Sequence, residues 1–173
     1  MAEPVGGARR LLCRELDLPQ EALLRLAELD PETYPVLFDS ASSGPLARVR
    51  QILADCGYQE VVNFAFVEEA WEADFAGNAK VIRLANPIAS HLSVMRSSLI
   101  GGLVANVATN LKRRQNRVRV FETGRCFFRD PQGGPVAGFH QPWKLTALAY
   151  GTALPEQWGG AARQVDFFDL KGD

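Results

Sequence analysis

The run Met95–Ser98 holds the residue types best suited to bind a charged ligand. Arg96 offers a planar fork of donors that matches a carboxylate or a phosphate. Ser97 and Ser98 precede an apolar segment, so either hydroxyl can cap a helix there and leave its N-terminus open to an anion. The same residues also fit a capped core helix with a buried structural arginine, which is the interpretation we favour. Both stay open at this point.

A basic cluster follows that apolar segment. Its cations are Lys112, Arg113, Arg114, Arg117 and Arg119. Such a run can contact phosphates, and cations are also favoured at the C-terminus of a helix. No aromatic residue lies among them to stack on a base, so a solvated or subunit-facing turn is favoured over direct tRNA contact. The net charge of −1 gives no general attraction to nucleic acid.

Glu122 and Arg125 lie in a predicted strand at a separation of three, so they point to opposite faces. We therefore expect Glu122 to meet an arginine on a neighbouring strand, or a group across a subunit interface, since a buried charge needs a partner. A catalytic role for this carboxylate is disfavoured. His91 and His140 have no cysteine or carboxylate at ligand spacing, so we predict no metal site.

Length and composition indicate a soluble protein with one ordinary domain and room for a small helical appendage. The chain has 173 residues, 47% hydrophobic and 23% charged. Cys13, Cys56 and Cys126 form no CxxC pair, so we expect reduced, structural thiols in a cytoplasmic protein. No apolar run approaches the ~18 residues of a membrane span. We predict no signal sequence and no membrane partner.

The chain divides at the breaker-rich segment Ser40–Pro45. Residues 1–45 are predicted to be a helical segment of unknown role plus a linker, because leucines recur at helical intervals over residues 8–38. Residues 46–173 are predicted to be one α+β domain with a mainly antiparallel sheet flanked by helices. Its helices are expected at Leu46–Cys56 and Ser97–Arg113, and its strands at Glu60–Val67, Lys80–Leu84, Val118–Phe128 and Lys144–Tyr150.

Four ordered segments in this second part carry a family resemblance. They read LADCGYQEVVNFAFV from Leu53, NPIASHLSVMRSSLIGGL from Asn86, VRVFETGRCFFRD from Val118 and PEQWGGAARQVDFFDLKGD from Pro155. Together they resemble the catalytic-like domain of the bacterial phenylalanyl-tRNA synthetase β chain over residues 46–173. The resemblance implies a class II aminoacyl-tRNA synthetase-like fold. It marks as structural the residues Asn86, Pro87, Glu122, Gly124 and Arg125.

The resemblance also implies a role. The family's domain is not the active site of the enzyme, so we expect a structural partner of the catalytic α chain in an (αβ)2 ligase. The whole complex would join phenylalanine to tRNA(Phe), with ATP and Mg²⁺ used by the α chain and no cofactor in this chain. The helix Ser97–Arg113 and the strand Val118–Phe128 are expected to supply core and contact surface.

In active class II enzymes, an arginine followed by hydroxyl residues near the substrate pocket matches Arg96, Ser97 and Ser98, which we take as a substrate-pocket remnant. Two further signatures of active enzymes are missing. No phenylalanine–arginine–x–glutamate motif occurs in NLKRRQNRVRVFE, which begins at Asn110, and no glycine-rich, arginine-terminated motif precedes Asp173. We expect a domain truncated at its C-terminus that does not activate an amino acid. The alternatives are a stand-alone RNA-binding module and an adenylating synthetase-like paralogue.

Overall fold

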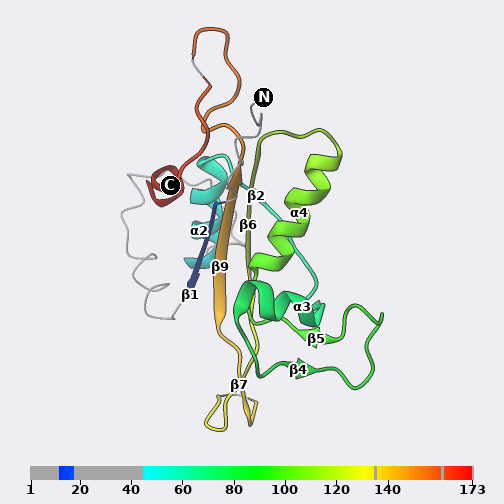
Figure 1. Ribbon diagram of the computed structural model, residues 1–173. Coiled ribbons are helices and arrows are strands. Elements are labelled where there is room, and N and C mark those ends of the chain that lie inside the picture. The colour runs from blue at the N-terminus through cyan, green and yellow to red at the C-terminus, as the bar shows by residue number, and fades with distance from the viewer. Residues whose placement is uncertain (1–11, 18–44, 135, 161, 173) are drawn as a thin grey trace.

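The computed structural model describes residues 12–17, 45–134, 136–160 and 162–172 (Figure 1). Two long strands form the middle of its main sheet. They are β6 (Val118–Arg125) and β9 (Trp143–Tyr150), which pair antiparallel along their whole length. The edge strand β1 (Leu12–Asp17) pairs antiparallel with β9, and β2 (Gln59–Glu60) pairs parallel with β6 at the other edge. The order is therefore β1-β9-β6-β2.

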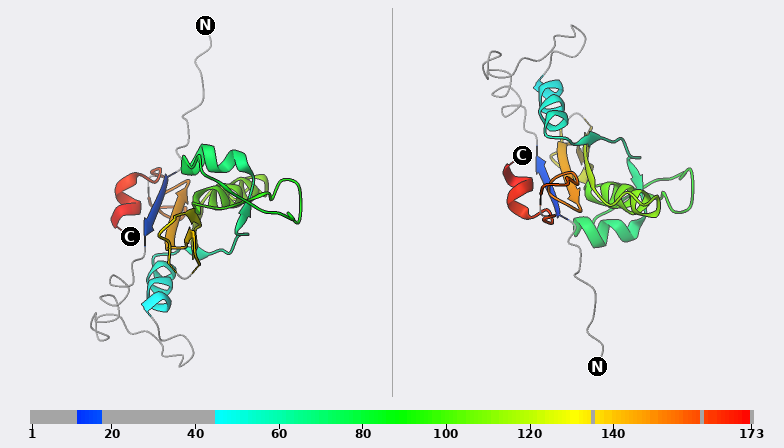
Figure 2. Two further views of the ribbon diagram at one scale, coloured as in Figure 1. Left: turned by 90° about the horizontal axis from the view of Figure 1, so that it is seen from below. Right: turned by 90° about the horizontal axis from the view of Figure 1, so that it is seen from above.

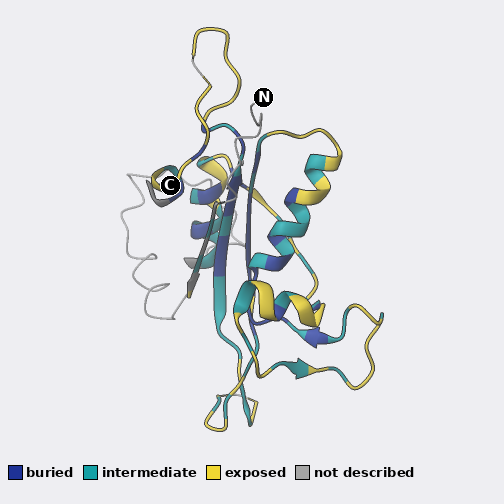
Figure 3. Cartoon of the chain, viewed as in Figure 1, coloured by how far each residue is buried: buried dark blue, intermediate teal, exposed yellow. Residues whose placement is uncertain are grey.

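Both faces of this sheet are covered, which makes the central strands apolar on both sides. On one face, α4 (Ile100–Lys112) packs Leu103 and Val107 against Val120 and Leu148. On the other face lie α2 (Pro45–Asp55) and α5 (Phe167–Gly172), whose buried residues cluster with Phe121. Figure 2 shows the sheet between these helices, and Figure 3 shows the buried residues concentrated along β6 and β9. β6 is buried on both faces, as its place in the middle of the sheet requires.

Smaller elements surround the start of α4. The strands β3 (Phe66–Val67), β5 (Val94–Met95) and β4 (Ile82–Arg83) form a second antiparallel sheet in that order. Between β3 and β4 the chain forms a short helix α3 (Glu69–Trp71) and a π-helix η1 (Glu72–Ala76). A hairpin of β7 (Phe128–Arg129) and β8 (Phe139–His140) extends beyond β6. The mixed, mainly antiparallel α+β architecture agrees with the prediction.

The predicted strand over Glu60–Val67 is divided between two sheets. The N–H of Val61 still donates to the carbonyl of Phe121 on β6. Two residues later, the N–H of Asn63 donates to the Glu122 carboxylate instead of to a backbone carbonyl. A buried side chain thus ends the pairing with β6, and the chain crosses to the second sheet, where Phe66 pairs with Met95.

The predicted helix over residues 8–38 is wrong for Leu12–Asp17, which form β1. Leucine spacing favoured a helix, but β9 offers an edge of backbone donors and acceptors, and pairing with it outweighs local propensity. Residues 18–44, which include most of the predicted linker, lie outside the described residues, and Pro45 is already the first residue of α2. The separate role predicted for residues 1–45 stays a prediction.

The expectation that Val118–Phe128 supplies contact surface is also wrong for most of its length. β6 lies between β9 and β2 in the main sheet, and all of its residues except Arg125 are buried or half-buried. Central strands have no free edge, and both faces here are covered by helices. β6 therefore contributes core, and any subunit contact must involve other elements.

Candidate functional site

Arg96 follows β5 and is buried, with 6% of its surface exposed. Its Nη1 lies 2.6 Å from Oε1 of Glu122, which is 1% exposed. Its Nε donates to the carbonyl of Arg125 at 3.2 Å. Asn63 donates its side-chain amide to the other carboxylate oxygen of Glu122 at 2.8 Å. The pair therefore has its hydrogen-bonding groups engaged by the protein itself, which fits the structural interpretation of Arg96.

Gly124 makes room for this ion pair. Glu122 and Gly124 lie two apart on β6 and so share a face. A Cβ atom at position 124 would lie far inside contact distance of Nη2 of Arg96. The motif Glu-Thr-Gly thus supplies the carboxylate that binds the guanidinium and the empty space that admits it. The structural roles predicted for Glu122 and Gly124 gain a physical reason here.

Ser97 contacts a second carboxylate, that of Glu72 on η1. The backbone N–H of Ser97 donates to Oε1 of Glu72 at 2.9 Å, and the Ser97 hydroxyl donates to Oε2. Asn78 donates its side-chain amide to the same Oε2 at 3.1 Å. Glu72 is 2% exposed and Ser97 is equally buried. Sequence reasoning missed Glu72, because its neighbours Glu68, Glu69 and Asp74 are also acidic and only burial distinguishes it.

Ser98 contacts a third carboxylate, that of Glu15 on β1. Oε2 of Glu15 accepts hydrogen bonds from the Ser98 hydroxyl and from the N–H of Leu99, each at 2.8 Å, and from the Thr146 hydroxyl at 3.0 Å. Oε1 lies 2.8 Å from Nζ of Lys144. The Ser98 hydroxyl also accepts from the N–H of Ile100, the first residue of α4, at 3.1 Å, although the N-cap position itself is Leu99.

These contacts perturb the charges of Glu15 and Lys144. Burial alone raises the pKa of Glu15, but hydrogen bonds from Lys144, the Leu99 N–H and Ser98 outweigh it, so the pKa lies below its ordinary value of 4.5. Burial lowers the pKa of Lys144, but its hydrogen bond to Glu15 and the nearby negative charges of Glu15 and Asp17 together outweigh burial, so that pKa lies above 10.5. Each charge therefore stabilises the other at neutral pH.

The start of α4 is thus filled by carboxylates of the same chain. Helix N-termini attract anions through their unpaired N–H groups and the helix dipole. Here Glu72 and Glu15 take that place, while Glu122 neutralises Arg96. The three residues predicted as a substrate-pocket remnant do lie together, but each is engaged by its own internal carboxylate. The arrangement holds the start of α4 to the rest of the domain, and the printed hydrogen bonds of these three residues go to groups of the same chain.

A family model described as the phenylalanyl tRNA synthetase beta chain CLM domain matches residues 40–173. The chain belongs to this family. A phenylalanine–tRNA ligase beta subunit of Dechloromonas aromatica is 67% identical over 132 residues, which are 75% of this chain and 17% of the relative. The beta subunit of Aromatoleum aromaticum is 62% identical over 144 residues, 83% of this chain and 18% of the relative. The chain therefore spans less than a fifth of these relatives.

A solved pyrrolysyl-tRNA synthetase structure from Desulfitobacterium hafniense is a weak structural match. It has a TM-score of 0.41 at 20% identity and covers 64% of this chain and 38% of that chain. The family assignment depends on the sequence matches alone. Those matches confirm the resemblance that the four motifs predicted, and they place this chain among proteins of translation.

Beside the ion pair of this CLM domain is a pocket of about 110 Å³. Its lining is mainly apolar. It includes Leu99, which precedes α4, Gly102 of α4, and Arg96. Aromatic side chains form much of the rest, namely Phe64, Phe66 and Trp71. The pocket is small, since ligand sites for drug-sized molecules have several hundred Å³.

The basic cluster of the CLM domain divides into two groups. Lys112, Arg113 and Arg114 are exposed at the end of α4, where Arg114 adopts a positive φ of 64°. Arg117 and Arg119 are half-buried: both donate to the carbonyl of Ala153, and the guanidinium of Arg119 lies 5.3 Å from the Tyr58 ring centroid. Only the first group is placed to meet a phosphate. The second holds the loop after β9.

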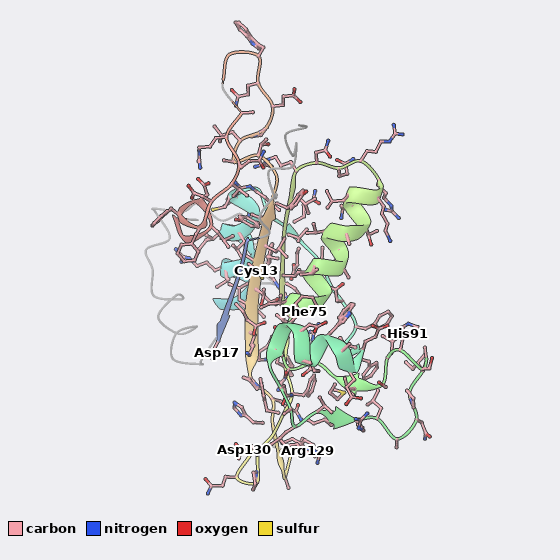
Figure 4. All side chains as sticks on the ribbon, viewed as in Figure 1. Cys13, Asp17, Phe75, His91, Arg129 and Asp130 are labelled. Carbon is pink, nitrogen blue, oxygen red and sulfur yellow. The ribbon has the colours of Figure 1, made fainter. Side chains whose placement is uncertain are left out.

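The remaining structural predictions have different outcomes. Asn86 and Pro87 are exposed in the loop between β4 and β5, the loop in which Figure 4 labels His91. Arg125 makes no pair with Glu122, as predicted, and lies with its guanidinium 5.5 Å from the Trp143 ring centroid. Within the part of the chain that the structure describes, no three metal-binding side chains gather, and no helix is long and apolar enough to cross a membrane.

Proposed function

We propose that this chain is a non-catalytic core domain of a phenylalanine–tRNA ligase beta subunit and supports its assembly with the catalytic alpha chain. The proposal includes a cytoplasmic ligase that joins phenylalanine to tRNA(Phe), with the active site, ATP and Mg²⁺ in the alpha chain. Membership of the family and the beta-subunit names of the relatives support the proposal that the chain is part of such a ligase.

One observation carries the non-catalytic part. An enzyme that activates an amino acid needs free donors to bind the carboxylate and phosphate groups of its substrates. The donors available at this place are Arg96, Ser97 and Ser98, and they are bound to Glu122, Glu72 and Glu15. A substrate would have to displace buried internal carboxylates. This supports a domain that contributes structure to the ligase and no chemistry of its own.

The sheet edge formed by β2 and the residues after it is a candidate contact surface. Val62 and Phe64 are 88% and 69% exposed, whereas Asn63 between them points inward to Glu122. Apolar side chains at period two along an edge segment are typical of a surface that another chain covers. An apolar patch is also expected of a domain that belongs to a larger assembly. We propose this edge for contact with the alpha chain.

The test is capture of the alpha chain. A tagged form of this chain and the alpha chain of the same ligase are co-expressed, with a complete beta subunit as positive control. We expect capture in a one-to-one ratio. Capture by the complete subunit but not by this chain would contradict an assembly role for this domain.

Paired variants locate the contact. Replacing Val62 and Phe64 by Glu is expected to abolish capture without lowering thermal stability, because both side chains are exposed. Ile88→Glu is the matched control, since Ile88 is 76% exposed in a loop away from this edge. Equal capture by the unaltered chain, the Val62 and Phe64 double variant and Ile88→Glu would exclude the edge as the contact.

Calorimetric titration of the unaltered chain with ATP or phenylalanine tests the adenylating alternative. We expect no binding, and saturable binding would favour an adenylating paralogue.

The exposed group Lys112, Arg113 and Arg114 favours RNA binding as a second candidate function. Its charges lie together at the C-terminal end of α4, and Arg117 and Arg119 are turned inward. Three exposed cations can contact a few phosphates but offer no base readout. A stand-alone RNA-binding module would bind tRNA with no alpha chain present, and the capture experiment distinguishes the two functions.

A further inference from the structure

The edge strand β1 lies far in sequence from the other strands of the main sheet. It pairs with β9 over six residues, from Leu12 opposite Ala149 to Asp17 opposite Lys144. The family match covers residues 40–173, so β1 lies outside it, and residues 18–44 separate β1 from α2. A segment from outside the family's domain therefore completes the sheet of that domain.

The groups that receive Glu15 belong to the family's domain. They are the Ser98 hydroxyl, the Leu99 N–H, the Thr146 hydroxyl and the Lys144 ammonium group. Thr146 has no exposed surface and the Lys144 side chain is 15% exposed. Four donors, two from the residues just before α4 and two from β9, thus converge on one carboxylate. The domain supplies this cradle and Glu15 of β1 occupies it.

The cradle accepts one acidic side chain of β1 and not the next one on the same face. Cys13, Glu15 and Asp17 share one face of the strand, and Figure 4 labels Cys13 and Asp17 on it. Cys13 packs against the apolar cluster under α4, and only Glu15 enters the cradle. Asp17 is exposed, 3.6 Å from Lys144. The site therefore distinguishes a carboxylate at one register position from its neighbour two residues along.

We propose that the free edge of β9 and the cradle of Ser98, Leu99, Lys144 and Thr146 form a binding site for an extended, carboxylate-bearing peptide segment, whose occupant in this chain is Leu12–Asp17. Backbone pairing with β9 supplies affinity, as in other cases of strand addition, and the cradle selects a glutamate at the fourth residue of the segment, the position of Glu15. A second copy of this segment supplied in trans is the matching ligand.

Cys13 reports whether β1 leaves the sheet. Its thiol is half-buried and burial raises its pKa to about 12, so alkylation requires opening of the strand. In the full chain, alkylation of each cysteine is followed by peptide mass mapping. Because the Glu15 charge also raises the Cys13 pKa, rates are compared after correction for the thiolate fraction of each variant. Glu15→Gln is then expected to raise the Cys13 rate about tenfold or more, because it weakens charge-assisted hydrogen bonds. Asp17→Asn is the matched control on the same strand, with an expected change under about twofold.

A second measurement uses the unaltered chain and so does not depend on a variant that folds. A peptide of residues 10–19 with serine in place of Cys13 is added in excess. It is expected to occupy the β9 edge whenever β1 opens, and so to speed Cys13 alkylation, while a peptide with Gln at the Glu15 position has little effect. The fully buried Cys126 should stay unlabelled in both cases.

Two results would overturn the proposal. Equal acceleration by the Glu and Gln peptides would exclude a carboxylate-selecting cradle. No acceleration by either peptide, with Cys13 alkylated in Glu15→Gln at the rate of the unaltered chain, would mean that β1 is a permanent strand of the sheet. Neither result bears on capture of the alpha chain, because Val62 and Phe64 lie at the opposite edge of the sheet.

Discussion

Arg96 and Glu122 are joined by a buried ion pair with 2.6 Å between Nη1 and Oε1. Arg96 precedes α4 and Glu122 lies on the central strand β6, so this one contact ties the start of the helix to the middle of the sheet. Asn63 completes it from the β2 side. Because both charges are removed from water, the pair is a point at which single substitutions act strongly.

Removal of one partner of this pair is expected to destabilise the domain severely. Glu122→Ala leaves the guanidinium of Arg96 buried without its carboxylate, at an expected cost of about 3–5 kcal/mol in the free energy of unfolding. The double variant Arg96→Leu, Glu122→Leu should lose less than Glu122→Ala, since no charge is left unpaired. Urea unfolding followed by circular dichroism measures both, and a smaller loss in the single variant would contradict this account.

Gly124→Ala is expected to destabilise the domain through the same pair. The added methyl group would meet Nη2 of Arg96, so the guanidinium must shift and lengthen its contact with Glu122. An over-packed core site costs about 1–3 kcal/mol. Gly159→Ala is the control, because a Cβ atom there meets nothing within 4 Å. Thermal unfolding of the two variants side by side decides the matter, and equal melting temperatures would count against the clash.

The contribution of Glu15 to stability should depend on pH. Its pKa is lower in the folded chain than the ordinary 4.5, so its stabilisation is fully present above pH 4.5 and is lost as the pH falls through the folded pKa. Below pH 4.5 the protection factors of the β1 amides, which are exchange rates corrected for the intrinsic pH dependence of exchange, should therefore fall, and fall less in Glu15→Gln. Lys144 stays charged there, and the Cys13 and Cys126 thiols stay neutral. The Asp17 carboxylate lies 3.6 Å from Nζ of Lys144. Asp17→Asn separates the Asp17 contribution, and identical pH profiles for Glu15→Gln and the unaltered chain would contradict the prediction.

The basic residues should differ in what they affect. Replacing Lys112, Arg113 and Arg114 by Ala is expected to leave stability nearly unchanged, and to reduce both the affinity for tRNA and its salt dependence if this surface meets phosphates. Arg119→Ala should instead lower stability, because its guanidinium holds the carbonyl of Ala153 and lies over Tyr58. Filter binding of tRNA at several salt concentrations tests the triple variant, and thermal unfolding tests both the triple variant and Arg119→Ala. Unchanged tRNA affinity in the triple variant would exclude the surface.

Local sequence was enough to predict the elements whose residue pattern matches the burial that they have in the fold. The helix that ends before Gly57 is one of them, because its apolar spacing and a glycine at φ 84° both mark the end. The strand over Val118–Arg125 is another, because neither of its faces is cleanly polar, which favours a position buried on both sides. The family followed from short motifs such as Glu-Thr-Gly-Arg, which sequence comparison confirms.

Tertiary structure decided what those motifs do. Whether Arg96 meets a ligand or Glu122, and whether Ser97 and Ser98 face solvent or Glu72 and Glu15, depends on contacts between segments far apart in the sequence. Periodicity carries no information on such contacts, because it describes one element at a time. β1 is the clearest case: its leucine spacing favoured a helix, and the open edge of β9 with a carboxylate cradle beside it made it a strand.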